Sequence, residues 1–285
     1  MNCGARAGIA PTVARILLMS SLTAASNVGA TVSAFVMRRL GVEVAVLPTT
    51  LFGRHPGWGA PGGGVTPPET LRGMWEGVRA QVERRGSGFD AVMTGYLGHE
   101  DHVALAVEVM DHLAPAHILV DPVMGDWDTE GGLYIPQQRA EAICDQLVPR
   151  AHIVTPNSWE WRYITGSLDE PRAEPPRPLA GTRETLVTSV EDGERIGAML
   201  FEGGRTHAVM HERFEDMPHG GGDALAADYL AQRVLGRSPA DALGPAVSSV
   251  FAMMRAADDT DAGELPLVRL QDTLKDAPAL EVRTT

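Results

Sequence analysis

Lysine is almost absent from this sequence of 285 residues, because Lys275 is the only lysine among 24 basic residues. This scarcity argues against catalysis by a lysine side chain. Cysteine is nearly as rare. Cys3 and Cys144 stand far apart with no CxxC or histidine-rich pattern beside them, so neither a disulfide framework nor a zinc site is indicated. A reducing compartment such as the cytoplasm fits this cysteine usage.

Positive charge and long apolar runs are also scarce. Acidic residues outnumber basic ones by 37 to 24, which argues against nucleic acid or an anionic membrane as the main partner. No apolar run is long enough to span a membrane. The run from Ile16 to Met19 is too short for a signal peptide and is better explained as a buried strand. With 44% hydrophobic residues, the chain can build one large α/β domain.

Short apolar runs alternate with helix-like patterns, which predicts a mostly parallel sheet covered by helices. Strands are expected at 15–20, 42–48, 89–95, 117–122, 152–156 and 184–190. Helices are expected at 28–41, 69–85, about 103–110, about 221–235 and about 239–255. The runs 195–201 and 206–214, separated by EGGR, predict a hairpin at one edge of the sheet.

Two stretches rich in glycine or proline, 53–68 and 167–182, are predicted to be loops because their composition breaks both periodicities. The core pattern begins near Arg15. We therefore expect a single domain over 15–285, preceded by an N-terminal extension over 1–14 that is predicted to be disordered.

Polar residues follow several of the predicted strands. They are Ser20 with Ser21 and the motifs DPVMGD, TPNSWE, VTS and HGGGD. Ligands of open α/β sheets bind beyond the carboxyl ends of the strands, so this pattern predicts a site for a polar, phosphorylated ligand. Asp121, Asp126 and Glu160 offer the oxygen ligands that Mg²⁺ prefers. Asp121 or Glu160 alone is explained equally well as a cap or turn residue.

The glycine run in HGGGD allows two interpretations. Glycine permits a tight turn and Asp223 suits the first turn of a helix, so the run can be an ordinary loop entering a helix. Alternatively, bare amides at a helix N-terminus attract an anion while the carboxylate takes a proton. Taken alone, the glycine run favours the first interpretation.

In combination, these motifs resemble those of the pyridoxal kinases of the ribokinase-like superfamily. DPVMGDWDTEGGLYIP, TPNSWE, TGYLG, MRRLG and HGGGD carry the resemblance, which covers about Arg15 to Ala257. It implies a three-layer α/β fold whose central, mostly parallel sheet is flanked by helices, with an edge hairpin and a flap loop over the site. It also implies a homodimer that uses ATP, Mg²⁺ and, as an open question, a monovalent cation. The implied reaction phosphorylates the 5′-hydroxymethyl group of pyridoxal, pyridoxine or pyridoxamine in vitamin B6 salvage.

The resemblance assigns roles to matching positions. Asp223 matches the catalytic base, and the amides of Gly220, Gly221 and Gly222 would hold the phosphate. The positions that match ATP-binding residues are Asp121, Thr155, Asn157, Glu160, Thr188 and Ser189, of which Asp121 and Glu160 would also hold Mg²⁺, partly through water. The positions that would face the vitamin are Ser21, Thr49, His55, Tyr96 and Tyr134.

The flap and the second loop need separate comment. His55 and Trp58 lie in the stretch 53–64 and could close over the pyridine ring, although Trp58 is equally well explained by ordinary packing. The stretch 167–182 stands where relatives usually carry a helix, so nucleotide affinity or local stability is expected to differ.

Two other functions remain open. A hydroxymethylpyrimidine kinase of the same fold would act on a similar flat ring with a primary alcohol. The segment DWDTEGGLY favours pyridoxal over the pyrimidine. A regulatory protein that binds the B6 vitamer or nucleotide without turnover is the other alternative, and the presence of Asp223, Asp121 and Glu160 argues against it.

Overall fold

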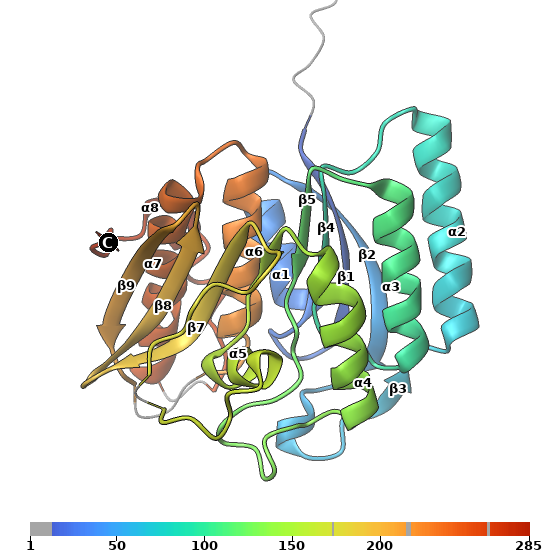
Figure 1. The fold of residues 1–285 in the computed structure, drawn as a ribbon. Helices are drawn as coiled ribbons and strands as arrows, with labels where there is room; N and C mark the ends of the chain where they lie inside the picture. The colour runs from blue at the N-terminus through green and yellow to red at the C-terminus, as the bar shows by residue number, and fades with distance from the viewer. Residues whose placement is uncertain (1–12, 173, 215–217, 261–262) are drawn as a thin grey trace, which may run out of the picture.

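The computed structural model describes residues 13–172, 174–214, 218–260 and 263–285 (Figure 1). The predicted extension over 1–14 therefore lies almost entirely outside the described residues. One sheet of ten strands, in the order β10-β9-β8-β7-β6-β5-β4-β1-β2-β3, forms the centre. The strands are β1 (Arg15–Thr23), β2 (Glu43–Phe52), β3 (Gly63–Val65), β4 (Ala91–Thr94), β5 (His117–Val120), β6 (Ile153–Val154), β7 (Glu184–Asp192), β8 (Arg195–Glu202), β9 (Arg205–Glu212) and β10 (Arg283–Thr284).

Six neighbouring strands, in the order β2-β1-β4-β5-β6-β7, run parallel, and helices cover both faces of the sheet. One core lies between the sheet and α1, α6 and α7, and the other lies between the sheet and α2 to α5. This three-layer α/β architecture confirms the predicted fold. The helices are α1 (Ala30–Arg39), α2 (Pro68–Arg85), α3 (Glu100–Leu113), α4 (Gln137–Ala142), α5 (Ser158–Thr165), α6 (Gly221–Val234), α7 (Pro239–Asp258) and α8 (Thr273–Asp276).

Alternation along the strands explains the two cores. In β1 the side chains of Ile16 and Leu18 enter the core with α1 and α6, whereas Leu17 and Met19 enter the core with α2 and α3. Because both faces are covered, the strand reads as a continuous apolar run. This explains why its position was evident from the sequence.

The edges of the sheet differ from the expectation in two places. The predicted hairpin is confirmed as β8 and β9, but the short strand β10 pairs with β9 and forms the outer edge. The stretch 53–68 is not a loop throughout. Near its end, Gly63–Val65 form β3, which pairs antiparallel with β2, and α2 already begins at Pro68. Its two glycines and single valine gave no strand signal, so backbone pairing with β2 defines this strand.

The proline-rich stretch 167–182 forms neither helix nor strand in its described part, as predicted. One buried arginine of α5, Arg162, holds its first half in place. The Arg162 guanidinium donates to the carbonyl oxygens of Ser167 (3.2 Å), Pro171 (2.8 Å) and Glu174 (3.0 Å). Hydrogen bonds from one cation thus replace the ladder that a helix would supply.

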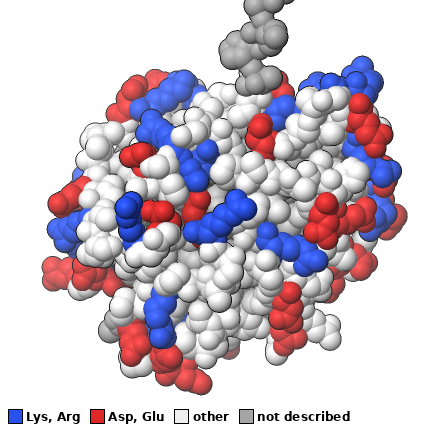
Figure 2. All heavy atoms as spheres, turned by 45° about the horizontal axis from the view of Figure 1, so that its top comes forward, with Lys and Arg blue, Asp and Glu red and all other residues white. Residues whose placement is uncertain are grey.

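In the part of the chain that the structure describes, none of the helices is long and apolar enough to cross a membrane. Acidic and basic side chains are interspersed on the face that Figure 2 shows.

Candidate active site

The carboxyl ends of the parallel strands bring three carboxylates together. Asp121 directly follows β5, Glu160 lies in the first turn of α5, and Asp223 lies in the first turn of α6. Asp121 is 8% exposed and Glu160 is 3% exposed. Burial raises the pKa of Asp121 well above its usual value, and the charges of Glu160 and Asp223 raise it further. The three groups therefore form one acidic cluster.

Burial also governs the other two carboxylates. It raises the pKa of Glu160 to about 7, although backbone amides partly offset the effect. It raises the pKa of Asp223 to about 6. Within the described residues, none of the three makes an ion pair with a lysine or arginine. Carboxylate oxygens without a cationic partner are the type of ligand that a hard metal ion prefers.

Glu160 has a clear structural role in this arrangement. Asn157 and Glu160 form a capping box at the start of α5, in which Glu160 Oε2 accepts from the Asn157 amide (2.9 Å) and Asn157 Oδ1 accepts from the Glu160 amide (2.8 Å). Glu160 Oε1 accepts from the amide of Met124 (2.8 Å). Across the described residues, no group of three acidic, histidine or cysteine side chains stands close enough to hold a metal. The structure thus shows Glu160 as a capping residue, and its binding of a metal ion stays a prediction.

The three glycines before Asp223 differ in what surrounds them. Gly220 has a φ of +90°, and a β-carbon there would overlap the carbonyl oxygen of Asn27. At Gly221 a β-carbon would touch the sulfur of Met254 at 3.4 Å. At Gly222 it would meet nothing within 4 Å. Gly220 is therefore required by the fold, whereas only a ligand approaching the backbone would require a glycine at position 222.

Asp223 is held by an element distant in the sequence. Its Oδ2 accepts a hydrogen bond from the amide of Gly29, at 2.9 Å, across 194 residues. Gly29 is the N-cap residue of α1, which packs beside α6 in Figure 1. Sequence reasoning missed Gly29, because no local pattern shows which carboxylate its amide meets.

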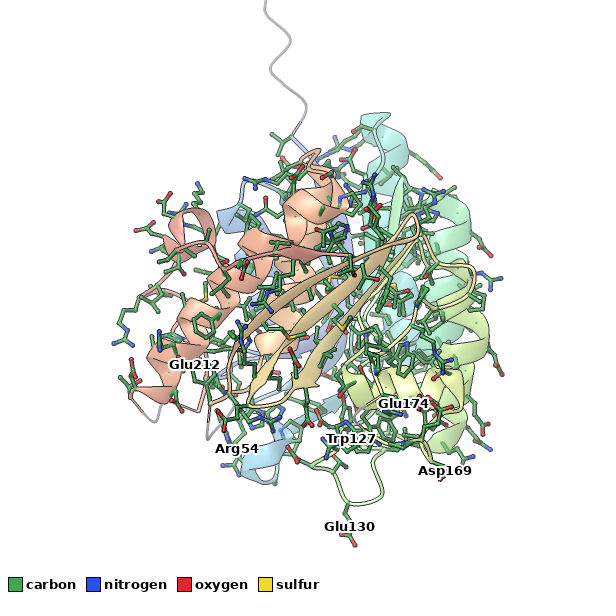
Figure 3. All side chains as sticks on the ribbon, turned by 60° about the vertical axis from the view of Figure 1, so that its left-hand side comes forward. Arg54, Trp127, Glu130, Asp169, Glu174 and Glu212 are labelled. Carbon is green, nitrogen blue, oxygen red and sulfur yellow. The ribbon has the colours of Figure 1, made fainter. Side chains whose placement is uncertain are left out.

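The residues expected to bind nucleotide are not all in one place. Thr155 is buried at the end of β6, and the Thr188 amide donates to Pro156 O (2.9 Å), which places Thr188 beside Asn157. Ser189 instead has a φ of +54° and lines a cavity of about 340 Å³ on the α5 side of the sheet. Trp127, labelled in the lower half of Figure 3, lines the same cavity.

The residues expected to face the vitamin come from β1, β2 and the segments that follow β2, β4 and β5. Thr49 Oγ1 donates to the carbonyl oxygen of Tyr96 (2.6 Å) and so ties β2 to the loop after β4. Ser21 is buried at the end of β1. The side chain of Tyr134 is 45% exposed, but burial of its hydroxyl, and then the charges of Glu160 and Asp121, raise its pKa well above the usual value.

The flap contacts the glycine run through aromatic rings. The rings of His55 and His219 lie 4.2 Å apart, and the Trp58 ring approaches His219 edge-on at 5.8 Å. Burial and the neighbouring His219 lower the pKa of His55. His219 is a second residue that sequence reasoning missed. It stands in the HGGGD motif itself, but a single histidine beside a glycine run carries no signal of its own.

This fold and this cluster of carboxylates at a glycine-rich helix start define a phosphotransferase of the ribokinase-like class. The family model described as phosphomethylpyrimidine kinase matches residues 72–268. A pyridoxal kinase of Leifsonia xyli is 32% identical over 90% of this chain and 94% of its own length. The chain belongs to the pyridoxal kinase family.

Solved structures show the same fold. The pyridoxal kinase of Entamoeba histolytica superposes with a TM-score of 0.83 at 19% identity, over 96% of this chain and all of its own. The pyridoxal kinase of Staphylococcus aureus, solved in complex with AMP-PCP and pyridoxal, gives a TM-score of 0.76 at 18% identity, over 96% and 99% of the two chains.

Proposed function

We propose that this protein transfers the γ-phosphoryl group of ATP to the 5′-hydroxymethyl group of pyridoxal, as part of vitamin B6 salvage. The observation that carries the proposal is the buried position of Asp223 behind the glycine run. Its pKa of about 6 lies near physiological pH, where a carboxylate is both ionised and basic enough to take a proton. Its place in the first turn of α6, after the glycine run, puts it beside amides that can hold the transferred phosphoryl group.

The amides of Gly220, Gly221 and Gly222 and the dipole of α6 provide the anion-binding end of the site. Gly222 has open space in front of its backbone, which leaves room for a phosphate to approach. Thr155, Asn157 and Thr188 then hold the nucleotide phosphates from the sheet edge. Ser189 is proposed to contact the nucleotide from the cavity that it lines together with Ser158 and Trp127.

Asp121 and Glu160 are proposed to hold Mg²⁺, with Glu160 acting partly through water because backbone amides occupy both of its oxygens. When bound, Mg²⁺ would neutralise charge on the ATP phosphates. Burial raises the pKa values of Asp121 and Glu160, and for Asp121 the charges of Glu160 and Asp223 add to the effect; a bound cation would stabilise both ionised carboxylates, which supports this role.

Ser21, Thr49, Tyr96 and Tyr134 are proposed to bind the vitamin, with the His55 ring closing over its flat face. His219 extends this assignment, because the two histidine rings already face one another at 4.2 Å. A vitamer entering between the flap and the glycine run would separate them. A homodimeric assembly and a cytoplasmic location remain predictions from the sequence.

The matching family model carries the name phosphomethylpyrimidine kinase, so a hydroxymethylpyrimidine substrate is the second candidate. A panel of pyridoxal, pyridoxine, pyridoxamine and hydroxymethylpyrimidine with ATP and Mg²⁺ separates the two. We expect the highest kcat/KM for a B6 vitamer, with pyridoxal converted to its 5′-phosphate. A clear preference for the pyrimidine would assign the chain to the second function, and no turnover with any of them would favour a binding protein.

A further inference from the structure

The N-terminus of α1 reaches the base of the proposed reaction. Gly29 precedes the helix as its N-cap and has no side chain with which to cap it. Its amide donates to Asp223 Oδ2 at 2.9 Å. A second contact joins the same two helices, because Ser33 Oγ lies 3.4 Å from the carbonyl oxygen of Asp223. The carboxylate of α6 thus accepts from the N-cap amide of α1, the contact that the N3 side chain makes in a capping box.

Two constraints reserve this position for glycine. Gly29 has a φ of +58° with ψ of -137°, a combination that other residues rarely adopt. A β-carbon at Gly29 would overlap Ser21 Oγ and stand 2.5 Å from the Ser21 carbonyl oxygen. Gly41, at the other end of α1, has a φ of +96° but has nothing within 4 Å of a β-carbon. The close packing is therefore specific to the end that meets Asp223.

The hydrogen bond distinguishes the two oxygens of the carboxylate. Oδ2 is occupied by the Gly29 amide, and within the described residues no donor is bonded to Oδ1. Oδ1 lies 4.0 Å from the point where a β-carbon of Gly95 would stand, at the end of β4. Gly95 directly follows β4 at the carboxyl edge of the sheet, and it has no side chain that would cover Oδ1. Oδ1 is therefore open toward this edge, where ligands of this fold class bind.

We propose that Gly29 is a positioning residue for the phosphoryl transfer, whose amide fixes the carboxylate of Asp223 by Oδ2 and leaves Oδ1 to take the proton of the acceptor hydroxyl. The inference rests on the function proposed above. A hydrogen bond to a carboxylate is among the stronger ones in proteins, and the dipole of α1 adds to it. This bond also lowers the pKa of Asp223 against the larger effect of burial.

The contact can be tested in the unmodified protein by NMR, without turnover. The Gly29 amide proton is expected to resonate downfield and to be protected from exchange, as a donor to a carboxylate should be. In Asp223→Asn and Asp223→Ala variants this signal should move upfield. The Gly41 amide, which donates to Arg38 O at 3.0 Å, serves as the control and should not move. A Gly29 amide that is insensitive to both substitutions would overturn the proposal.

The positioning role is tested by a double-mutant cycle. Alanine keeps the amide, but its β-carbon would push the backbone away from Ser21 and weaken the bond to Asp223. Gly29→Ala should therefore lower kcat on the order of 10-fold, while KM for ATP changes little. In an Asp223→Asn background the same substitution should have almost no further effect, because Gly29 acts through Asp223. Gly41→Ala is the matched control for backbone strain in α1. Equal effects of Gly29→Ala in both backgrounds would show a merely structural role.

The two proposals fail in different ways. If the unmodified protein phosphorylates neither a B6 vitamer nor a pyrimidine, the proposed function fails, whatever the NMR result. If turnover is normal and the cycle is additive, only the role of Gly29 fails. If Gly29→Ala does not fold, the NMR comparison still decides whether its amide binds Asp223.

Discussion

Replacing Asp223 by asparagine should stabilise the ligand-free protein while it slows turnover. Burial raises the folded-state pKa of Asp223 from 3.8 to about 6. Each pKa unit corresponds to about 1.4 kcal/mol, so the ionised carboxylate costs at most about 3 kcal/mol of stability at neutral pH. Asp223 keeps some access to solvent and asparagine forms a weaker bond with Gly29, so we expect a net gain of about 1–2 kcal/mol.

The pH dependence gives the prediction its sign. The folded protein holds the Asp223 proton more tightly than the unfolded chain, so this group lowers stability as the pH rises from about 4 to about 6. The gain from Asp223→Asn should therefore be complete above about pH 6 and absent below about pH 4. Above about pH 6, where the Asp223 carboxylate is ionised, the same substitution should lower turnover on the order of 10²- to 10⁴-fold, with little change in ATP binding.

Urea unfolding at about pH 7.5 and about pH 4 tests the predicted gain in stability, and kcat measured in parallel tests the predicted loss of turnover. Asp169→Asn is the matched control. Asp169 is an exposed residue of the proline-rich loop, labelled in Figure 3, and its replacement should change stability by less than about 0.5 kcal/mol. If Asp223→Asn destabilises the protein at both pH values, burial of the charge is not the dominant effect. Near-normal turnover would reduce Asp223 to a helix-start residue.

Three further predictions concern the metal, the flap and the glycines. Glu160→Gln should raise the Mg²⁺ concentration needed for half-maximal rate, and an unchanged Mg²⁺ dependence would leave Glu160 with only its role in the capping box of α5. Trypsin cleavage after the exposed Arg54 (Figure 3) should slow when vitamer and nucleotide are both present, and equal cleavage with and without ligands would count against flap closure over the site. Gly222→Val should keep the fold but weaken ATP binding, measured by calorimetry. Gly220→Ala should instead lower the urea midpoint, because Gly220 has a positive φ and its β-carbon would overlap the Asn27 carbonyl. The opposite pattern would refute the view that the fold requires Gly220 and the ligand requires Gly222.

The sequence predicted the layered fold and most of its strands because buried parallel strands read as short apolar runs between helical patterns. It did not predict β3 or β10. These strands have two or three residues and exposed side chains, so only their backbone pairing with β2 and β9 defines them. That Glu160 is a cap or turn residue was an open alternative in the sequence, and only the structure showed that it forms a capping box with Asn157.

The sequence by itself determined which polar residues follow the strands, and therefore which of them could reach one edge of the sheet. The tertiary structure alone decided that Gly29 meets Asp223 and that His55 meets His219, since these contacts depend on how helices and loops far apart in the chain are placed. It also decided the charge properties of the site. The pKa of Asp223 or Glu160 depends on how much water surrounds the group, and burial is a property of the folded chain that no residue pattern specifies.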